Sequence, residues 1–413
     1  MGQSSYSERM LHRVNLDAVG GVEVSFLQYA EFRQALGIAD TVVPGDSVHP
    51  RFGDALAAPL QTLWREQFKH WHGVRLPRAF RGLRARWAAH CIRPYAPSVI
   101  LAWNHIGSRQ VADIANAARL PLIHYEHGEA WREQARHAGA FFDQVDGAIV
   151  NSFAAERMLA LRWGWQGPVE RVYYSCDGVR AIDAARGAPP SDRPIRIGAA
   201  ARMIELKGHR IALHTVKVLR DEHGLDVTLA IAGTGAEESA LHAESKRLGL
   251  TDIVDFKGSV PDMAAFYDEI DLMLVPSMVE PFGRTSMEAQ ARGCPLIVTA
   301  VDGLPETLEP GNTAAQVVPD WSLDEYKKEL GGNVESVLPW AYDPVSDQLI
   351  QPRAVSPARL ATAIRELVTD ENAYRDASLS GLRNANKRFL PELYGPAVDA
   401  AVASLVRVGK QRT

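Results

Sequence analysis

The feature that most constrains this chain is an alternation of short apolar runs with helical stretches, which occurs in two separate series. Short apolar runs bounded by turn residues are typical of buried strands, and strands that alternate with helices predict parallel sheets with crossover helices. The expected strands are 10–15, 98–103, 121–126 and 146–151 in the first series, and 195–200, 226–232, 253–256, 271–276 and 295–300 in the second. The sequence therefore predicts an α/β chain with two Rossmann-like, doubly wound parallel-sheet domains that face each other across a cleft.

The length of the chain also favours two domains, because 413 residues exceed one ordinary hydrophobic core. A segment at 184–194 is rich in proline, alanine and glycine and lacks periodicity, so we expect it to be the linker. The expected divisions are a first domain over 1–185, a second domain over 186–390 and a terminal helix within 391–413.

Charge and cysteine content argue against several classes of protein. The net charge of −5 gives no global attraction to nucleic acid. The three cysteines lack paired spacing, which predicts a reducing compartment with neither disulfides nor a zinc site. The start of the sequence lacks the apolar segment of a signal peptide, and no apolar run approaches the roughly 20 residues of a membrane span. We therefore expect a cytoplasmic protein without nucleic acid among its partners.

The clearest candidate site follows the predicted strand 271–276. Glu280 and Glu288 lie eight positions apart, the first in a loop before a proline and the second inside a helix. Gly283 leaves bare amide groups at the start of that helix, where an anion or a sugar hydroxyl can approach. The two carboxylates can thus hold different parts of one polar ligand. The alternative is an ordinary helix N-terminus whose acidic residues suit the helix dipole.

Two loops of the second series carry groups suited to a diphosphate. Arg202 and Lys207 flank the loop after strand 195–200, where the arginine offers a fork of donors and the lysine a point charge. Gly233 and Gly235 follow the next strand and allow the backbone to come close to a ligand. A full G-x-G-x-x-G and a P-loop are absent from this sequence, which argues against nicotinamide, flavin and ATP-hydrolysing chemistry.

The first series offers weaker candidates. Gly20 and Gly21 lie between a predicted strand and a helix, which is either a phosphate cradle or simply a turn. His127 follows strand 121–126, and ligands of parallel sheets gather beyond the carboxyl ends of strands. The alternative for His127 is a structural histidine that hydrogen-bonds within a loop.

The stretch 60–93 is strongly basic, with eight cations and one acid, or +8 − 1 = +7. Trp64, Phe68 and Trp71 are spaced as on one face of a helix. Such a surface suits an anionic membrane or a phosphorylated acceptor, and the alternative is a solvated basic helix whose aromatic side chains pack in the core. The candidate acceptor or membrane surface comprises Arg78, Arg81, Arg84 and Arg86. Farther along, 320–352 is irregular and longer than an ordinary loop, which indicates a functional or family-specific insertion.

Taken together, these residues resemble the retaining glycosyltransferases of family 4, the glycosyl transferases group 1, which have the GT-B architecture. The matching features are Gly20 and Gly21, His127, the loop of Arg202, Lys207 and Gly208, the turn of Gly233 and Gly235, and E-P-F-G-x-x-x-x-E from Glu280 to Glu288. The resemblance covers nearly the whole chain and is strongest over 195–310. The stretch 174–180 departs from the Asn-Gly-Val-Asp that family members often carry.

The resemblance implies a role for each matching residue. Arg202 and Lys207 would bind the donor diphosphate, Glu288 the ribose, and Glu280 the donor sugar. The implied catalytic residues are His127, Arg202, Lys207 and Glu280, and the implied donor-binding residues are Gly20, Gly21, Gly233, Gly235, Phe282, Gly283, Arg284 and Glu288. No cofactor or metal is implied, because fixed cations neutralise the leaving diphosphate. The C-terminal helix would cross back to the first domain.

The implied activity is retaining transfer from a nucleotide-sugar, a UDP-sugar being favoured over GDP-mannose. The acceptor would be a saccharide or a lipid-linked molecule in bacterial surface polysaccharide or lipopolysaccharide assembly. Such an acceptor is compatible with a peripheral location on the inner face of the cytoplasmic membrane. One alternative is a GT-B sugar-nucleotide epimerase, which needs no acceptor. The other is a non-catalytic scaffold that binds sugar-nucleotides.

Overall fold

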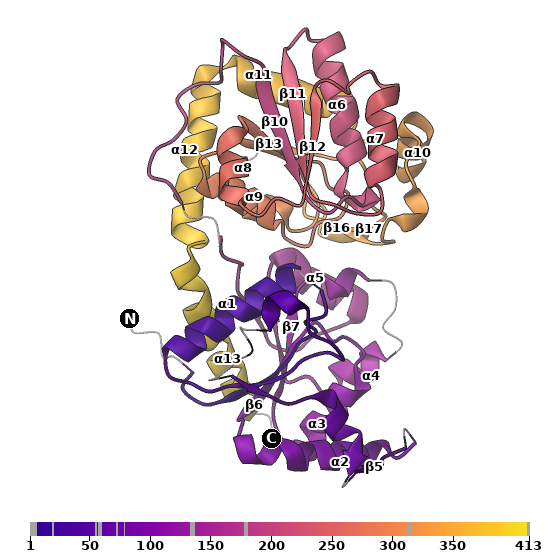
Figure 1. Cartoon of the computed structure of the whole chain (residues 1–413), viewed down its shortest axis with the longest axis vertical. Helices are drawn as coiled ribbons and strands as arrows, with labels where there is room; N and C mark the ends of the chain where they lie inside the picture. Colours follow the sequence, from indigo (N-terminus) through magenta and orange to yellow (C-terminus); the bar gives the residue numbers. More distant parts are fainter. Residues whose placement is uncertain are drawn as a thin grey trace. The chain divides into compact units, whose positions relative to one another are not determined.

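The computed structural model describes residues 6–410, apart from 19, 54–55, 57–59, 72, 78, 133–136, 177–180 and 313–314. The chain forms two compact units (Figure 1). The first unit comprises Met1–Tyr174 with Glu392–Thr413, and the second comprises Ser175–Pro391. The division between the units therefore falls earlier in the chain than the predicted boundary at 185/186.

The first unit is built on a parallel seven-stranded sheet in the order β3-β2-β1-β6-β7-β8-β9. Its strands are β1 (Met10–Arg13), β2 (Thr41–Val43), β3 (Gln61–Thr62), β6 (Val99–Trp103), β7 (Leu122–Glu126), β8 (Gly147–Val150) and β9 (Val169–Arg171). The central strands β6, β7 and β8 are buried along their whole length, as expected for strands covered on both faces. The four strands predicted in this half of the sequence are confirmed.

Helices cover both faces of this sheet. The crossover helix α1 (Gly21–Ala35) leads from β1 to β2, whereas α3 (Arg109–Ala118), α4 (Ala138–Phe142) and α5 (Phe153–Trp163) lead in the opposite direction across the sheet. Because such crossovers are right-handed, the reversal of direction places α1 on one face and α3 to α5 on the other. The helix α2 (Arg81–Ile92) packs against α3.

The C-terminal helix α13 (Pro391–Lys410) belongs to the first unit and shares the core of β1, β6 and α1. Its buried residues Val398, Val402 and Leu405 each stabilise the unit by about 1.5–3 kcal/mol through apolar burial. Asp399 of this helix is fully buried, and its Oδ1 accepts hydrogen bonds from the hydroxyl of Tyr29 at 2.5 Å and from Arg33 at 3.2 Å. These bonds fix α13 against α1.

The second unit is built on a parallel six-stranded sheet in the order β12-β11-β10-β13-β14-β15. Its strands are β10 (Ile195–Ala200), β11 (Val227–Ala232), β12 (Val254–Gly258), β13 (Leu272–Val275), β14 (Leu296–Thr299) and β15 (Gln316–Val317). The chain moves outward from β10 to β12 and then returns to β13 on the other side of β10. Ligands of doubly wound sheets bind at such a switch point, beyond the carboxyl ends of the strands.

The helices α6 (His209–Asp221) and α7 (Glu238–Arg247) cover one face of the second sheet, and α8 (Met263–Glu269) and α9 (Arg284–Ala291) cover the other. The helix α11 (Pro357–Thr369) packs against α6, and α12 (Glu371–Arg388) packs against α9 (Figure 1). All five strands predicted in this half are confirmed, as are the predicted helices between them.

Three expectations differ from the structure. Trp64, Phe68 and Trp71 do not share a helix, because the chain forms a 3-10 turn at Arg65–Phe68 and then the hairpin of β4 (His70–Trp71) and β5 (Val74–Arg75). The segment 184–194 is irregular as predicted, but it lies within the second unit. The insertion at 320–352 is partly regular, with the helix α10 (Leu323–Leu330) and the hairpin of β16 (Ala341–Asp343) and β17 (Gln348–Ile350).

Candidate functional site

The switch point of the second sheet brings together the loops after β10 and β13. The first loop carries Arg202 and Lys207, and the second carries Glu280. Gly208 allows the loops to meet, because its φ is +72° and a Cβ there would lie 2.1 Å from the carbonyl oxygen of Pro276. A larger residue would force the two loops apart. The glycine is therefore required both by its backbone conformation and by this close approach.

Lys207 and Glu280 form an ion pair in which Nζ lies 2.5 Å from Oε2. Only 13% of the lysine side chain and 16% of the glutamate side chain are exposed, so the pair is largely removed from water. Its charges therefore interact more strongly than those of an exposed pair. The guanidinium of Arg202 is exposed, and within the described residues it has no hydrogen bond or ion pair. Arg202 is thus available to an incoming anion, whereas Lys207 is already engaged.

Asp302 holds Glu280 in place, although the sequence did not reveal this role. Its Oδ2 accepts the N–H of Glu280 at 2.8 Å, and its Oδ1 accepts the N–H of Tyr342 at 2.6 Å. The side chain is 1% exposed, and the residue has a left-handed φ of +48°. Asp302 thereby joins the Glu280 loop to the β16–β17 hairpin of the insertion.

Buried polar groups on the core side of the turn hold Lys207 in place. The 3-10 helix Glu205–Lys207 places Glu205 in the core, where its carboxylate accepts a hydrogen bond from the hydroxyl of Tyr326 in α10. Burial, followed by the charge of Glu205, raises the pKa of Tyr326, so its hydroxyl stays protonated and able to donate. The insertion at 320–352 therefore supports both loops of the candidate site.

Gly233 and Gly235 pack against the Arg202 loop. A Cβ at Gly233 would lie 2.0 Å from the carbonyl oxygen of Ala201, and one at Gly235 would lie 2.4 Å from that of Met203. These contacts explain why glycine is needed at both positions. The contacts position the loop of Arg202. The role of the two glycines in donor binding stays a prediction.

The helix α9 carries the remaining predicted donor residues. Glu288 is 9% exposed, and its Oε2 accepts a hydrogen bond from the hydroxyl of Tyr267 at 2.8 Å. Its Oε1 lies 3.8 Å from Nε of Arg284. Burial, followed by the charge of Glu288, raises the pKa of Tyr267 well above its usual value. Phe282 is buried and its ring meets Phe389 edge-on, so only its backbone can face a ligand.

In the first unit, His127 lies just beyond the carboxyl end of β7, as predicted. Its ring is stacked with those of Trp103 and Tyr174, and its Nδ1 lies 2.7 Å from the hydroxyl of Tyr174. That hydroxyl also accepts a hydrogen bond from Asn151 at 2.9 Å. Two ring contacts and a hydrogen bond to one ring nitrogen therefore position the imidazole. Tyr174, which the sequence did not single out for this role, positions it.

Gly20 and Gly21 begin α1 as predicted, but an acidic side chain lies beside them. Gly20 is the N-cap, and a Cβ there would lie 2.8 Å from Oε2 of Glu23. Burial raises the pKa of Glu23, because the carboxylate is partly removed from water at the helix start. The carboxyl group of Glu23 thus lies beside the glycines, whose role in donor binding stays a prediction.

A second, partly buried acid lies two residues after His127. Burial raises the pKa of Glu129 to about 7, and its Oε2 accepts the N–H of Ile106 at 2.7 Å. The neighbouring carboxylate of Glu126 also raises this pKa, and the ring of His124 lowers it. The sequence offered no signal for this group, because burial cannot be inferred from a glutamate in a loop.

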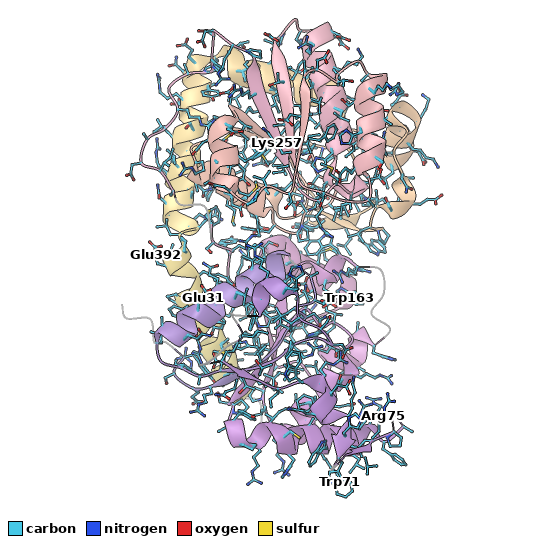
Figure 2. All side chains as sticks on the ribbon, in the orientation of Figure 1. Glu31, Trp71, Arg75, Trp163, Lys257 and Glu392 are labelled. Carbon is cyan, nitrogen blue, oxygen red and sulfur yellow. The ribbon has the colours of Figure 1, made fainter. Side chains whose placement is uncertain are left out.

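The structure describes three of the four arginines of the predicted acceptor surface, and that surface stays a prediction. Arg81 and Arg84 line a cavity formed with the β4–β5 hairpin, whereas Arg86 lines a different one. Arg78 lies outside the described residues. Figure 2 shows Trp71 and Arg75 at the hairpin, and the side chain of Trp71 is 52% exposed. The aromatic residues of this stretch therefore differ in burial, since Trp71 is exposed whereas Phe68 is 2% exposed and belongs to the core.

Neither a metal centre nor a spanning helix is found in the part of the chain that the structure describes. No three His, Cys, Asp or Glu side chains there converge in a way that could hold a metal ion. None of the described helices combines the length and the apolar character needed to cross a membrane.

Known proteins share the sequence pattern of the second unit. Residues 182–331 match the family model described as glycosyl transferases group 1. A D-inositol 3-phosphate glycosyltransferase of Streptomyces bingchenggensis is 28% identical over 60% of this chain, and the match spans 61% of that relative's own length. A lipopolysaccharide core biosynthesis glycosyltransferase, LpsE, of Rhizobium meliloti is 24% identical over 69% of this chain and 77% of its own.

The fold is shared with solved structures. That of Anabaena Alr3699/HepE in complex with UDP and glucose superposes with a TM-score of 0.68 and 17% identity, over 96% of this chain and all of the other. At this identity the likeness shows the GT-B fold. The predicted fold class is confirmed by this likeness and by the two Rossmann-like sheets.

Proposed function

Because the chain belongs to the glycosyl transferases group 1 through residues 182–331, we propose that it transfers a sugar from a nucleoside diphosphate donor to an acceptor hydroxyl. The observation that carries this proposal is the convergence of Arg202, Lys207 and Glu280 at the switch point of the second sheet. Two cations and a carboxylate on adjoining loops suit a ligand that is a diphosphate at one end and a polyhydroxyl sugar at the other.

The proposed division of labour follows from the charge that develops during the reaction. Breaking the bond between sugar and phosphate places negative charge on the departing diphosphate, and Arg202 and Lys207 would stabilise it. Glu280 would accept hydrogen bonds from donor-sugar hydroxyls, and Glu288 would accept them from the ribose. Amides around Phe282 and Gly283 would complete the donor contacts, because α9 begins there and the first N–H groups of a helix have no partner within the helix itself.

Retention of configuration and independence of metal belong to this proposal. The two fixed cations would take the place that a divalent ion has in other phosphoryl-leaving reactions. A UDP-sugar is the favoured donor, supported by the UDP bound in the structurally similar Anabaena HepE. His127, which Tyr174 positions, would lie beside the transferred sugar.

The acceptor would be a saccharide or a lipid-linked molecule of a surface polysaccharide or lipopolysaccharide. The description of the Rhizobium relative as a lipopolysaccharide core glycosyltransferase supports this choice. Peripheral contact with an anionic membrane is supported by the exposed Trp71, Val74 and Phe80 on and after the hairpin. Cosedimentation with anionic vesicles tests that contact, and a protein that stays in the supernatant would remove it.

The first experiment is a thermal-shift screen against UDP, GDP, ADP and their sugar conjugates, with and without EDTA. A ligand that binds only the native state stabilises it by about 2.7 kcal/mol at a hundredfold excess over Kd. We expect a selective shift with UDP that EDTA leaves unchanged. No shift with any nucleotide would favour another ligand class for this fold.

A second candidate, a sugar-nucleotide epimerase, is separated by product analysis. It would isomerise or hydrolyse the donor without an acceptor, whereas a transferase turns over faster when acceptor is added. A non-catalytic scaffold would bind the sugar-nucleotide without isomerising it, hydrolysing it or transferring its sugar.

A further inference from the structure

A cavity of about 690 Å³ lies within the first unit and shares none of the residues proposed above for the donor. It lies among the 3-10 turn Arg65–Phe68, the β4–β5 hairpin, α2 and α3. This volume is within the range of small-molecule sites, and it exceeds the needs of a single inorganic anion. The shape therefore suits a ligand of saccharide size.

The cavity wall carries an excess of positive charge. Five cations and two carboxylates line it, which gives +5 − 2 = +3. The cations are Arg65, Lys69, Arg75, Arg81 and Arg84. They come from three separate segments, the 3-10 turn with the adjoining Lys69, the hairpin and α2, so no single basic helix accounts for the excess. Cavities lined by one sign of charge concentrate ligands of the opposite sign.

The two carboxylates neutralise only part of this charge. Asp46 lies 3.2 Å from Arg65 and 3.6 Å from Lys69, and Asp113 receives two donors of Arg81. Within the described residues, Arg75 and Arg84 have no carboxylate partner, although both line the cavity. A phosphate monoester carries a charge of about −1.5 to −2 at neutral pH, and arginine forks match its oxygens.

The floor of the cavity is apolar. Phe68 and Leu76 are 2% and 7% exposed, and Ala85 and Ala88 of α2 complete the wall beside them. An apolar floor excludes water and strengthens the attraction between the guanidinium groups and an anion. It also leaves room for the carbon frame of a ligand beside its charged group.

We propose that this cavity binds the phosphoryl group of a phosphorylated, saccharide-sized ligand, with Arg75 and Arg84 as its principal anchors. The proposal deepens the proposed function, on which it rests in one respect: the ligand would be the acceptor. The same phosphoryl chemistry occurs on a soluble sugar phosphate and on a lipid headgroup, and the experiment distinguishes these two sources.

The experiment is calorimetric titration of the full chain with glucose 6-phosphate, glucose and inorganic phosphate at constant ionic strength, with and without saturating UDP. We expect glucose 6-phosphate to bind at least tenfold more tightly than glucose. Arg75→Gln and Arg84→Gln should each weaken its binding roughly tenfold, the scale of losing one charge-assisted hydrogen bond. Neither substitution strands a carboxylate, so both variants should fold.

Arg93→Gln is the matched control, because it removes the same charge directly after α2 at a position outside the cavity. It should leave the affinity within twofold, and an effect equal to that of Arg84→Gln would overturn the proposal. Glucose 6-phosphate binding identifies a soluble source. Binding only to vesicles that contain phosphatidic acid, with the same dependence on Arg84, identifies a lipid source. Absence of both overturns the proposal.

Titration with UDP on the same samples separates this proposal from the proposed function. Binding of UDP without any phosphoryl ligand refutes the cavity and leaves the donor assignment standing. Binding of glucose 6-phosphate without any nucleotide refutes the donor assignment and leaves the cavity standing.

Discussion

The ion pair of Lys207 and Glu280 allows the donor assignment to be tested against a purely structural role. A lysine that only neutralises a neighbouring glutamate and a lysine that holds a diphosphate respond differently when the glutamate is also changed. The required proteins are Lys207→Ala, Glu280→Gln and the double variant. Lys217→Ala is a matched control, because Nζ of Lys217 also lies 2.5 Å from a carboxylate, that of Asp221, in an exposed pair.

The expected loss of stability follows from the burial of the pair. Removing one partner of a fully buried ion pair costs about 3–5 kcal/mol, and exposed pairs contribute about 0–1 kcal/mol. Lys207 and Glu280 keep 13% and 16% of their side chains exposed, so we expect Lys207→Ala to destabilise the protein by about 1–3 kcal/mol. At roughly 2–4 °C per kcal/mol for a domain of this size, the melting temperature should fall by roughly 2–12 °C. The control should change by less than about 0.5 kcal/mol.

The double variant should recover most of this loss, since Glu280→Gln removes the stranded charge. Its affinity for UDP is the decisive quantity. If Lys207 holds the diphosphate, the double variant should bind UDP at least tenfold more weakly than Glu280→Gln alone, because a charge-assisted hydrogen bond contributes about 1.5–3 kcal/mol. Turnover of Lys207→Ala should fall by roughly 10²–10³, the scale of losing one preorganised charge partner.

The assay is calorimetric titration with UDP on all five proteins, wild type included, beside thermal melts. Equal UDP affinity in Glu280→Gln and in the double variant would refute the diphosphate role and leave Lys207 as a structural partner of Glu280. Near-normal turnover of Lys207→Ala would refute it as well.

Three further outcomes are expected. Gly208→Ala should destabilise the protein by about 2 kcal/mol or more beyond the control Gly249→Ala in melting experiments. Both glycines have φ near +71°, but only Gly208 has a backbone oxygen 2.1 Å from the added Cβ. Equal losses would show that the two loops that meet at Gly208 can separate freely. Asp302→Asn tolerates the left-handed φ but turns an amide N–H₂ toward a backbone N–H. It should therefore raise KM for the sugar donor and cost about 1–3 kcal/mol of stability in denaturant titrations. An unchanged KM would show that Asp302 does not set the position of Glu280. Burial raises the pKa of Glu129 to about 7, so the folded state holds this proton more tightly than the unfolded chain does. The free energy of unfolding should therefore fall by at most about 3 kcal/mol as the pH rises from about 4.5 through 7. Glu129→Gln should flatten that decline in melts recorded between pH 5 and 7.5, and a decline of the same slope would assign it to another group.

Local periodicity was sufficient to predict the central strands of both sheets, because each of them is a short apolar run. It missed β2, β3, β9 and β15, which are too short to show a periodic pattern. The basic stretch shows where this reasoning fails. Trp64, Phe68 and Trp71 have helical spacing, but Gly73 with a φ of +82° and Pro77 interrupt the chain, and a hairpin forms instead. The insertion at 320–352 held an unused signal, since Ser322 and Glu325 form a capping box that begins α10.

The site was predictable only in its parts. Two motifs 73 residues apart in sequence predicted the loops of Lys207 and Glu280, yet nothing in either motif revealed that the two side chains pair. The residues that hold these loops in place, Asp302 and Tyr326, were harder to predict. They act through hydrogen bonds that form only when the chain is folded. Spacing identifies residue types that suit a chemistry, whereas partners and burial depend on tertiary packing.

The pairing has a consequence for the order in which a donor would be bound. Arg202 is exposed and unengaged within the described residues, so it is the group that an arriving diphosphate meets without breaking an existing contact. Lys207 can turn to the phosphate only by weakening its bond to Glu280, which would leave that carboxylate buried without a cation. Hydroxyls of the donor sugar would supply the missing hydrogen bonds to Glu280, so a complete sugar-nucleotide relieves a cost that a bare nucleotide leaves in place. The ion pair would thereby favour the intact donor over the released nucleotide, which is the direction that product release requires.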